Sequence, residues 1–198
     1  IIKSDDTWPF DDDFFDIVLS SQVVEHVHDH GHFFSQNWRV LKEKGFSIHL
    51  FPVKNYILEG HLKLPFVHRI QQWRLLYRYI RFLSALRIGK WKRLKNRCSL
   101  DDYSESYADL LTHSCHYLSI GELLNYGKKC GFRTGFNYTG NFYYEKLKEL
   151  FRMKHKFKYP KENTYMFLIH IFKYIQCITL FIEKQDSYIN YIAKYGAD

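Results

Sequence analysis

Four histidines stand at alternate positions in VEHVHDHGHFF, the stretch that runs from residue 24 to residue 34. Imidazole and carboxylate groups are ligands of zinc and other transition metals. On a β-strand, alternate side chains share one face, so four imidazoles could converge on a single ion. Whether this chemistry is available therefore depends on the element that the stretch forms.

The residues around this stretch predict a strand, a helix and a second strand. FDIVLS, residues 15–20, is a short apolar run typical of a buried strand. Asp29 can cap a following helix, which the lysines of KEKG and the helix-stopping Gly45 would end. Residues 46–51 predict the second strand, and the three elements form the βαβ unit of a parallel sheet.

In this arrangement the four histidines are divided between elements. His26 follows the first strand, whereas His30 and His32 fall in the first turn of the helix that Asp29 caps. Their imidazoles would then point in different directions, and we expect no metal site here.

The C-terminal part of the chain alternates helices and strands again. Ser119 and Glu122 have the spacing of a capping box at the start of a helix over 119–130. Further predicted elements are strands at 132–138 and 177–183 and helices at 147–155 and 165–175. With 198 residues, 46% of them hydrophobic, the chain is predicted to be one α/β domain with a core of its own.

The segment 60–100 interrupts this alternation with eleven lysines and arginines and no acidic residue. Arg74, Arg78 and Arg81 share one helical face, opposite an apolar face. We interpret the segment as part of a helical insertion over about 54–117. It would act as a lid over a pocket, and contact with a membrane surface or a lipid ranks second. Nucleic acid ranks last, because the aromatic residues lie on the apolar helix face and not on a strand platform.

Cysteine usage and hydropathy indicate where the protein resides. The four cysteines are scattered, without a CxxC pair, which favours a reducing compartment and thus the cytoplasm or the membrane periphery. The apolar segment 165–182 is barely long enough to span a membrane. It carries Lys173 near its middle, where a charge is costly in lipid, so we do not interpret it as a membrane span.

The N-terminal motifs resemble the second half of class I S-adenosylmethionine-dependent methyltransferases. The residues that carry the resemblance are Pro9-Phe10, Phe15-Asp16, Ser20-Ser21, Glu25-His26, Asp29, Arg39-Val40-Leu41-Lys42 and Gly45. A weaker likeness covers HYLSIGELLNYGKKCGFRTGF at 116–136, and an insertion such as 55–70 occurs in one branch of the family.

The resemblance implies a partial Rossmann-like, doubly wound sheet. The four predicted strands would be strands four to seven of the family fold. The first three strands, the Gly-rich turn and the acidic residue for the ribose hydroxyls have no counterpart in this sequence. Residues 1–198 thus resemble the C-terminal part of a methyltransferase domain.

The resemblance also implies a site for S-adenosylmethionine at the carboxyl ends of the strands. Ser20, Ser21 and Gln22 would lie near the methyl group, and Asp5 or Asp6 would accept a hydrogen bond from the adenine amino group. The alternatives are that the serines merely end a strand and that the aspartates belong to an exposed loop.

Three residues are candidates for catalysis. His26 would act as a base or orient the acceptor, and Glu59 beside His61 could raise the pKa of that imidazole and assist proton removal. Alternatively, His26 packs a helix against the sheet, while Glu59 and His61 anchor the insertion.

The function that the resemblance implies is methyl transfer to a small-molecule, lipid or glycan acceptor. Without the Gly-rich turn these 198 residues should bind the cofactor poorly, and the strand at 15–20 would be an exposed apolar edge. The alternative is a non-catalytic basic module that binds a membrane surface or nucleic acid.

Overall fold

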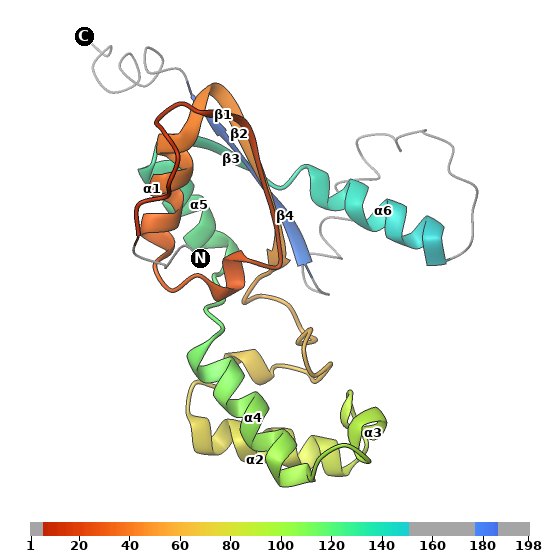
Figure 1. Cartoon of the computed structure of the whole chain (residues 1–198). Coiled ribbons are helices and arrows are strands. Elements are labelled where there is room, and N and C mark those ends of the chain that lie inside the picture. Colours follow the sequence, from red (N-terminus) through yellow and green to blue (C-terminus); the bar gives the residue numbers. More distant parts are fainter. Residues whose placement is uncertain (1–5, 151–176, 186–198) are drawn as a thin grey trace.

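The fold is a four-stranded sheet with helices on both faces, as the sequence predicted. This computed structural model describes residues 6–150 and 177–185. The strand order is β1 (Phe15–Ser21), β2 (Leu41–Pro52), β4 (Cys177–Lys184) and β3 (Phe132–Gly135). β1 and β2 are parallel, and β4 runs antiparallel to both of its neighbours. Helices α1 (His30–Val40) and α5 (Ile120–Lys129) cover one face, and α6 (Tyr138–Leu150) lies on the other side, beside β4 (Figure 1).

Helix α1 begins where the sequence predicted. Asp29 is its N-cap, and the Asp29 carboxylate accepts a hydrogen bond of 2.9 Å from the backbone N–H of His32. Phe33 and Phe34 on its inner face enter the main core, which they share with apolar residues of β2, α5 and β4. The helix thus holds the sheet through its apolar face.

The predicted end of this helix at Gly45 was wrong. α1 ends at Val40, and β2 already begins at Leu41, which is fully buried and pairs with Phe15. The next pair is Ile17 with Phe46, so the residues of KEKG form a bulge within β2. A Cβ at Gly45 would lie only 2.8 Å from the carbonyl oxygen of Lys42, so glycine serves close backbone approach here instead of ending a helix.

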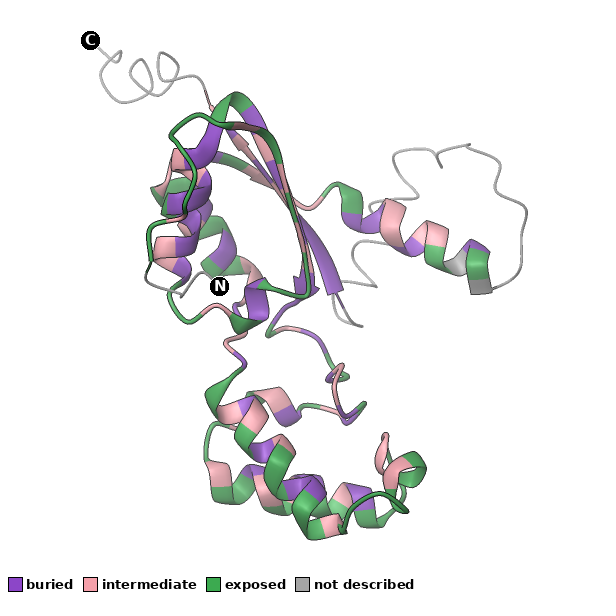
Figure 2. Cartoon of the chain, in the orientation of Figure 1, coloured by how far each residue is buried: buried purple, intermediate pink, exposed green. Residues whose placement is uncertain are grey.

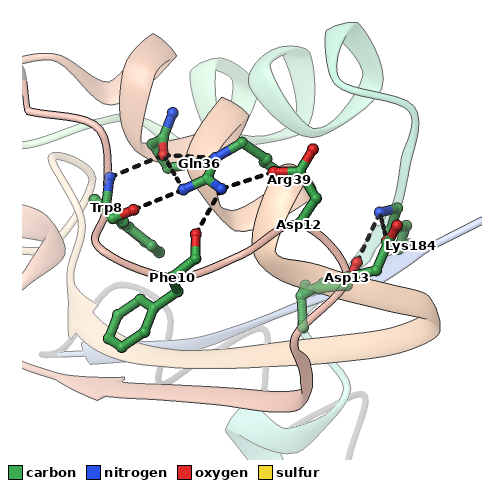
Figure 3. A network of polar contacts seen from close by, with 8 residues as sticks. Trp8, Phe10, Asp12, Asp13, Gln36, Arg39 and Lys184 are labelled. Carbon is green, nitrogen blue, oxygen red and sulfur yellow. Dashed lines mark hydrogen bonds and ion pairs between the residues drawn. The ribbon is translucent and has the colours of Figure 1, made fainter.

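Arg39 fastens the loop that leads into β1 (Figure 3). Its Nη1 donates to the Phe10 carbonyl at 2.7 Å and to Asp12 at 2.8 Å. Its Nη2 donates to the Trp8 carbonyl at 2.8 Å, and Gln36 accepts from both Nη2 and Nε. All five N–H groups of the guanidinium are therefore used, which fixes the loop against α1.

β1 is the edge strand of the described sheet, and its outer face is uncovered. Figure 2 shows β1 as exposed and intermediate along its length. Ile17 is 49% exposed and Leu19 70% exposed, although their apolar run predicted a buried strand. Val18, on the opposite face, packs against the main core. The described residues therefore leave β1 as the exposed apolar edge that we expected for this chain.

The C-terminal elements agree in part with the sequence. The capping box of Ser119 and Glu122 is formed, and β4 matches the strand predicted at 177–183. β3 ends at Gly135, short of the predicted 138, because α6 already begins at Tyr138. The predicted helix at 165–175 and residues 151–155 lie outside the described residues. In the described ranges no helix is long and apolar enough to cross a membrane.

Between β2 and α5 the chain forms a separate group of helices below the sheet (Figure 1). It consists of the 3-10 helix η2 (Val67–Arg69), α2 (Trp73–Ala85), α3 (Trp91–Leu94) and α4 (Leu100–His113). α2 and α4 pack side by side around a second core. That core contains Leu62, Leu64, Val67, Leu76, Ile80, Tyr103, Ala108, Leu111 and Cys115.

We predict that Gly45→Ala destabilises the fold by about 1–3 kcal/mol, because the new Cβ would clash with backbone that cannot move without disturbing the pairing of β1 and β2. Urea unfolding measures the loss. Gly121→Ala is the matched control, since a Cβ there meets nothing within 4 Å and alanine favours the first turn of α5. Equal stability of the two variants would contradict this account of Gly45.

Candidate functional site

Three segments converge at the carboxyl ends of β1 and β2. Gln22 follows β1, the 3-10 helix η1 (Val24–His26) comes next, and residues 53–61 follow β2. Because β4 is antiparallel, its first residue Cys177 lies at the same edge, paired with Pro52. A pocket of about 170 Å³ opens here, lined by Gln22, Pro52, Tyr56, Glu59, Gly60, His61, Lys90 and Cys177.

Glu59 and His61 form a tight pair in this pocket. The fully buried Glu59 carboxylate accepts hydrogen bonds from His61 Nδ1 at 2.7 Å and from the backbone N–H of His61 at 2.9 Å. The oxygen that binds His61 also accepts from the hydroxyl of Tyr117 at 3.2 Å, and the other oxygen accepts from the backbone N–H of Leu62 at 2.7 Å. The carboxylate is thus held rigidly, and Nε2 is the His61 nitrogen that Glu59 leaves available.

The pKa values of this pair move in opposite directions. Burial alone would raise the pKa of Glu59, but the hydrogen bonds from the His61 side chain and from two backbone N–H groups outweigh it and lower that pKa. The hydrogen bond to Glu59 raises the pKa of His61, against the opposing effects of burial and of the Lys90 charge. The Glu59 carboxylate therefore makes neutral His61 a stronger base than an isolated imidazole, because it stabilises the imidazolium that forms when a proton binds.

His26 lies next to this pair and also links the two cores. Its ring stands edge-on to the His61 ring, with 5.9 Å between centroids. Its Nδ1 donates to the carbonyl oxygen of Ser114 at 2.7 Å, so His26 ties η1 to the segment after α4. The structure thus places His26 beside a candidate base and gives it an anchoring contact as well.

Glu25 is a buried residue that the sequence reasoning did not connect with this pocket. It is 1% exposed, and neither carboxylate oxygen has a hydrogen-bond partner on another described residue. Burial raises the pKa of Glu25, whereas a contact with its own backbone N–H and the charges of His26 and His61 oppose that shift only in part. Its position next to His26 was the available signal, but no local pattern indicated that its carboxylate would lack a partner on another residue.

The residues proposed to contact the cofactor are dispersed. Gln22 lines the pocket, has a left-handed backbone with φ of 56°, and places Nε2 3.7 Å from the Cys177 sulfur. Ser20 does not line the pocket, because its hydroxyl contacts Nδ1 of His49 at 2.7 Å. Ser21 is exposed at the end of β1.

Of the two proposed adenine-binding acids, Asp6 is described and does not line the pocket. Asp6 is exposed, and its backbone carbonyl accepts a hydrogen bond of 2.9 Å from Nε2 of His32. Asp5 lies outside the described residues. The role of these aspartates stays a prediction.

The four alternating histidines have four different neighbours. His26 binds the carbonyl oxygen of Ser114, and Nε2 of His30 donates to the carbonyl oxygen of Val24 at 3.1 Å. Nε2 of His32 donates to the carbonyl oxygen of Asp6. The ring of His28 meets that of His116, with 5.0 Å between centroids. Within residues 6–150 and 177–185, no three His, Cys, Asp or Glu side chains are grouped to hold a metal ion.

Comparison with known proteins yields one family match. Residues 2–49 match the family model described as a methyltransferase domain. The match covers β1, η1, α1 and most of β2, so it includes Gln22 and His26 but ends before Glu59 and His61. Residues 2–49 thus carry the sequence signature of a methyltransferase domain. A search of curated proteins found no match to this chain.

Several solved structures are similar to this chain at low identity. The YcgJ protein of Bacillus subtilis has a TM-score of 0.40 and 14% identity, over 91% of this chain and 68% of that one. A methyltransferase in complex with the Trm112 activator of Haloferax volcanii has a TM-score of 0.42 and 14% identity, over 92% and 60%. An S-adenosylmethionine-dependent methyltransferase from Mesorhizobium loti has a TM-score of 0.42 and 13% identity, over 88% and 64%. The chain thus spans 60–68% of the length of these three proteins.

We predict that Glu25→Gln stabilises the protein by about 1 kcal/mol at pH 7, because it removes an unpaired buried charge. Because the pKa of Glu25 is raised in the folded state, its destabilising effect develops as the pH rises above the ordinary value of 4.5, so the gain should vanish near pH 4. Urea unfolding at both pH values measures the effect. Glu122→Gln, which weakens the capping box of α5, should instead destabilise at pH 7. A loss of stability in Glu25→Gln would show that the carboxylate has a partner.

We predict that Glu59→Gln lowers the pKa of His61 toward or below its ordinary value of about 6.5. An NMR titration of the His61 ring measures this. Since the folded-state pKa of His61 is raised, its contribution to stability is present below pH 6.5 and is lost as the pH rises through the raised value. Glu105→Gln, an exposed carboxylate on α4, should leave the titration unchanged. An unaltered His61 titration in Glu59→Gln would refute the assignment.

Proposed function

We propose that this chain is the C-terminal part of an S-adenosylmethionine-dependent methyltransferase, and that the pocket beside β1 receives the methyl acceptor. The observation that carries the proposal is a juxtaposition. Gln22, from the segment that matches the methyltransferase family model, shares one pocket with the Glu59–His61 pair. The pocket lies at the carboxyl ends of parallel strands, where open α/β sheets bind their ligands.

The described residues do not form a complete cofactor site. The pocket of about 170 Å³ is smaller than the roughly 300–1,000 Å³ of most ligand sites. Ser20 is engaged by His49, and Asp6 does not line the pocket. The residues that line the pocket would form the wall of the site on the side of the methyl acceptor.

His61 has the surroundings of a general base. Nε2 would accept the proton of an acceptor hydroxyl or amine, while Nδ1 remains bonded to Glu59. The buried carboxylate would stabilise the imidazolium that forms, and its bonds to the backbone N–H of His61 and Leu62 keep the ring oriented. His26, edge-on to His61, would position that ring or the acceptor.

The acceptor that we propose is a small molecule, a glycan or a lipid-linked group with an ionisable hydroxyl or amine. We also propose a cytoplasmic or membrane-peripheral location. The four free thiols support a reducing compartment.

We predict that calorimetric titration of the 198-residue chain with S-adenosylmethionine shows no binding tighter than about 1 mM, because the sequence holds no Gly-rich turn to approach the cofactor. Tight binding would overturn this expectation.

The proposal itself is tested on the protein encoded with its upstream reading frame. That protein should transfer methyl groups from labelled S-adenosylmethionine, and His61→Gln should lower kcat about 100-fold. Glu105→Gln is the control. A protein that binds liposomes or oligonucleotides in a salt-sensitive manner but transfers no methyl group would favour a non-catalytic basic module.

A further inference from the structure

A second pocket, of about 360 Å³, lies at one end of the helical group and is lined by cations. Its lining residues are Lys63, Gly89, Lys90, Lys92, Arg93 and Leu94. Lys63 lies in the turn after Glu59 and His61, and the others belong to the loop between α2 and α3 or to α3 itself. Two segments therefore bring four positive charges to one hollow.

The backbone holds these two segments firmly together. The N–H of Lys90 donates to the carbonyl oxygen of Leu62 at 2.9 Å. Gly89 has φ of 79°, and a Cβ there would lie 2.7 Å from that same carbonyl oxygen. Only glycine permits this close approach, so the pocket has a defined backbone frame and is more than a set of surface lysines.

No acidic side chain among the described residues forms an ion pair with the cations of this pocket. Among the residues that the structure describes, Lys63, Lys92 and Arg93 form no ion pair. Arg81, on the neighbouring helix, shows the contrast, because it pairs with Asp101. Cations that converge without acidic partners raise the local positive potential and favour an anion, above all a phosphate group.

The cationic pocket adjoins the Glu59–His61 pocket. Lys90 lines both of them, and its Nζ donates to the carbonyl oxygen of Gly60 at 3.1 Å, between Glu59 and His61. A ligand whose anionic group occupies the cationic pocket could therefore extend past Lys90 to the candidate base.

We propose that the cationic pocket binds a phosphate or pyrophosphate group of the methyl acceptor, with Lys90 between that group and His61. The role of the ligand as acceptor rests on the function proposed above, whereas anion binding by the pocket does not. Two sources offer this chemistry, a soluble phosphate ester and the headgroup of a lipid. Three exposed apolar residues directly precede the pocket in sequence and would meet a lipid: Phe82, Leu86 and Ile88.

The pocket is tested by calorimetric titration of the full chain with inorganic pyrophosphate at physiological salt, without S-adenosylmethionine. The double variant Lys92→Gln/Arg93→Gln should weaken binding at least tenfold. Lys128→Gln/Lys129→Gln removes two exposed charges from the end of α5 and should change affinity less than twofold. Equal losses in both variants, or no binding by the wild type at millimolar pyrophosphate, would overturn the proposal.

Vesicle flotation separates the two sources. Binding to vesicles that contain phosphatidic acid but not to neutral vesicles, lost in Lys92→Gln/Arg93→Gln and weakened about tenfold by Phe82→Ser, would support a lipid headgroup. Pyrophosphate binding without vesicle binding would support a soluble ester. A single-stranded RNA that binds this pocket more tightly than pyrophosphate would overturn the assignment to an acceptor. Pyrophosphate binding that persists while methyl transfer fails would count only against the proposed enzyme activity.

Discussion

The guanidinium of Arg39 determines where the N-terminal strand lies. β1 has one strand neighbour in the described sheet and an uncovered outer face, so strand pairing alone gives it little support. Arg39 binds the preceding loop to α1 with every N–H group that it has, and Lys184 of β4 adds an ion pair of 2.6 Å with Asp13 (Figure 3). Through this anchor, Gln22 and η1 reach the edge of the sheet where the candidate base lies.

Two glutamates near His61 have opposite electrostatic environments. Glu59 receives four hydrogen bonds, and its pKa is lowered, whereas Glu25 receives none from the side chain or backbone of another described residue, and burial raises its pKa. Titratable groups whose pKa values are driven apart are typical of sites that move protons. Lys90 lines both the Glu59–His61 pocket and the adjoining cationic pocket.

The sequence predicted what local patterns determine and missed what distant contacts determine. The Asp29 cap, the capping box at Ser119 and the strands at 15–20, 46–51 and 177–183 follow from signals within a few residues. The helix end predicted at Gly45 was wrong, because a glycine that follows lysines is typical both of a helix end and of a bulge in a strand. The convergence of Gln22 with Glu59 depends on sheet register, and the isolation of Glu25 depends on burial by segments far along the chain. The eleven cations of segment 60–100 were visible in the sequence, but the pocket that four of them line depends on the contact between Lys90 and Leu62.

The position of β4 in the sheet affects how the chain is built. β4 is the last strand in sequence, yet it lies between β2 and β3, and β3 pairs with no other strand in the described sheet. During synthesis β3 must therefore wait for residues 177–184. At about 5–20 residues per second, making the intervening segment takes about 2–8 s. For that time Phe132 and the inner residues of β2 lack β4 as their strand partner, and unpaired apolar strands of this kind make a nascent chain prone to aggregation.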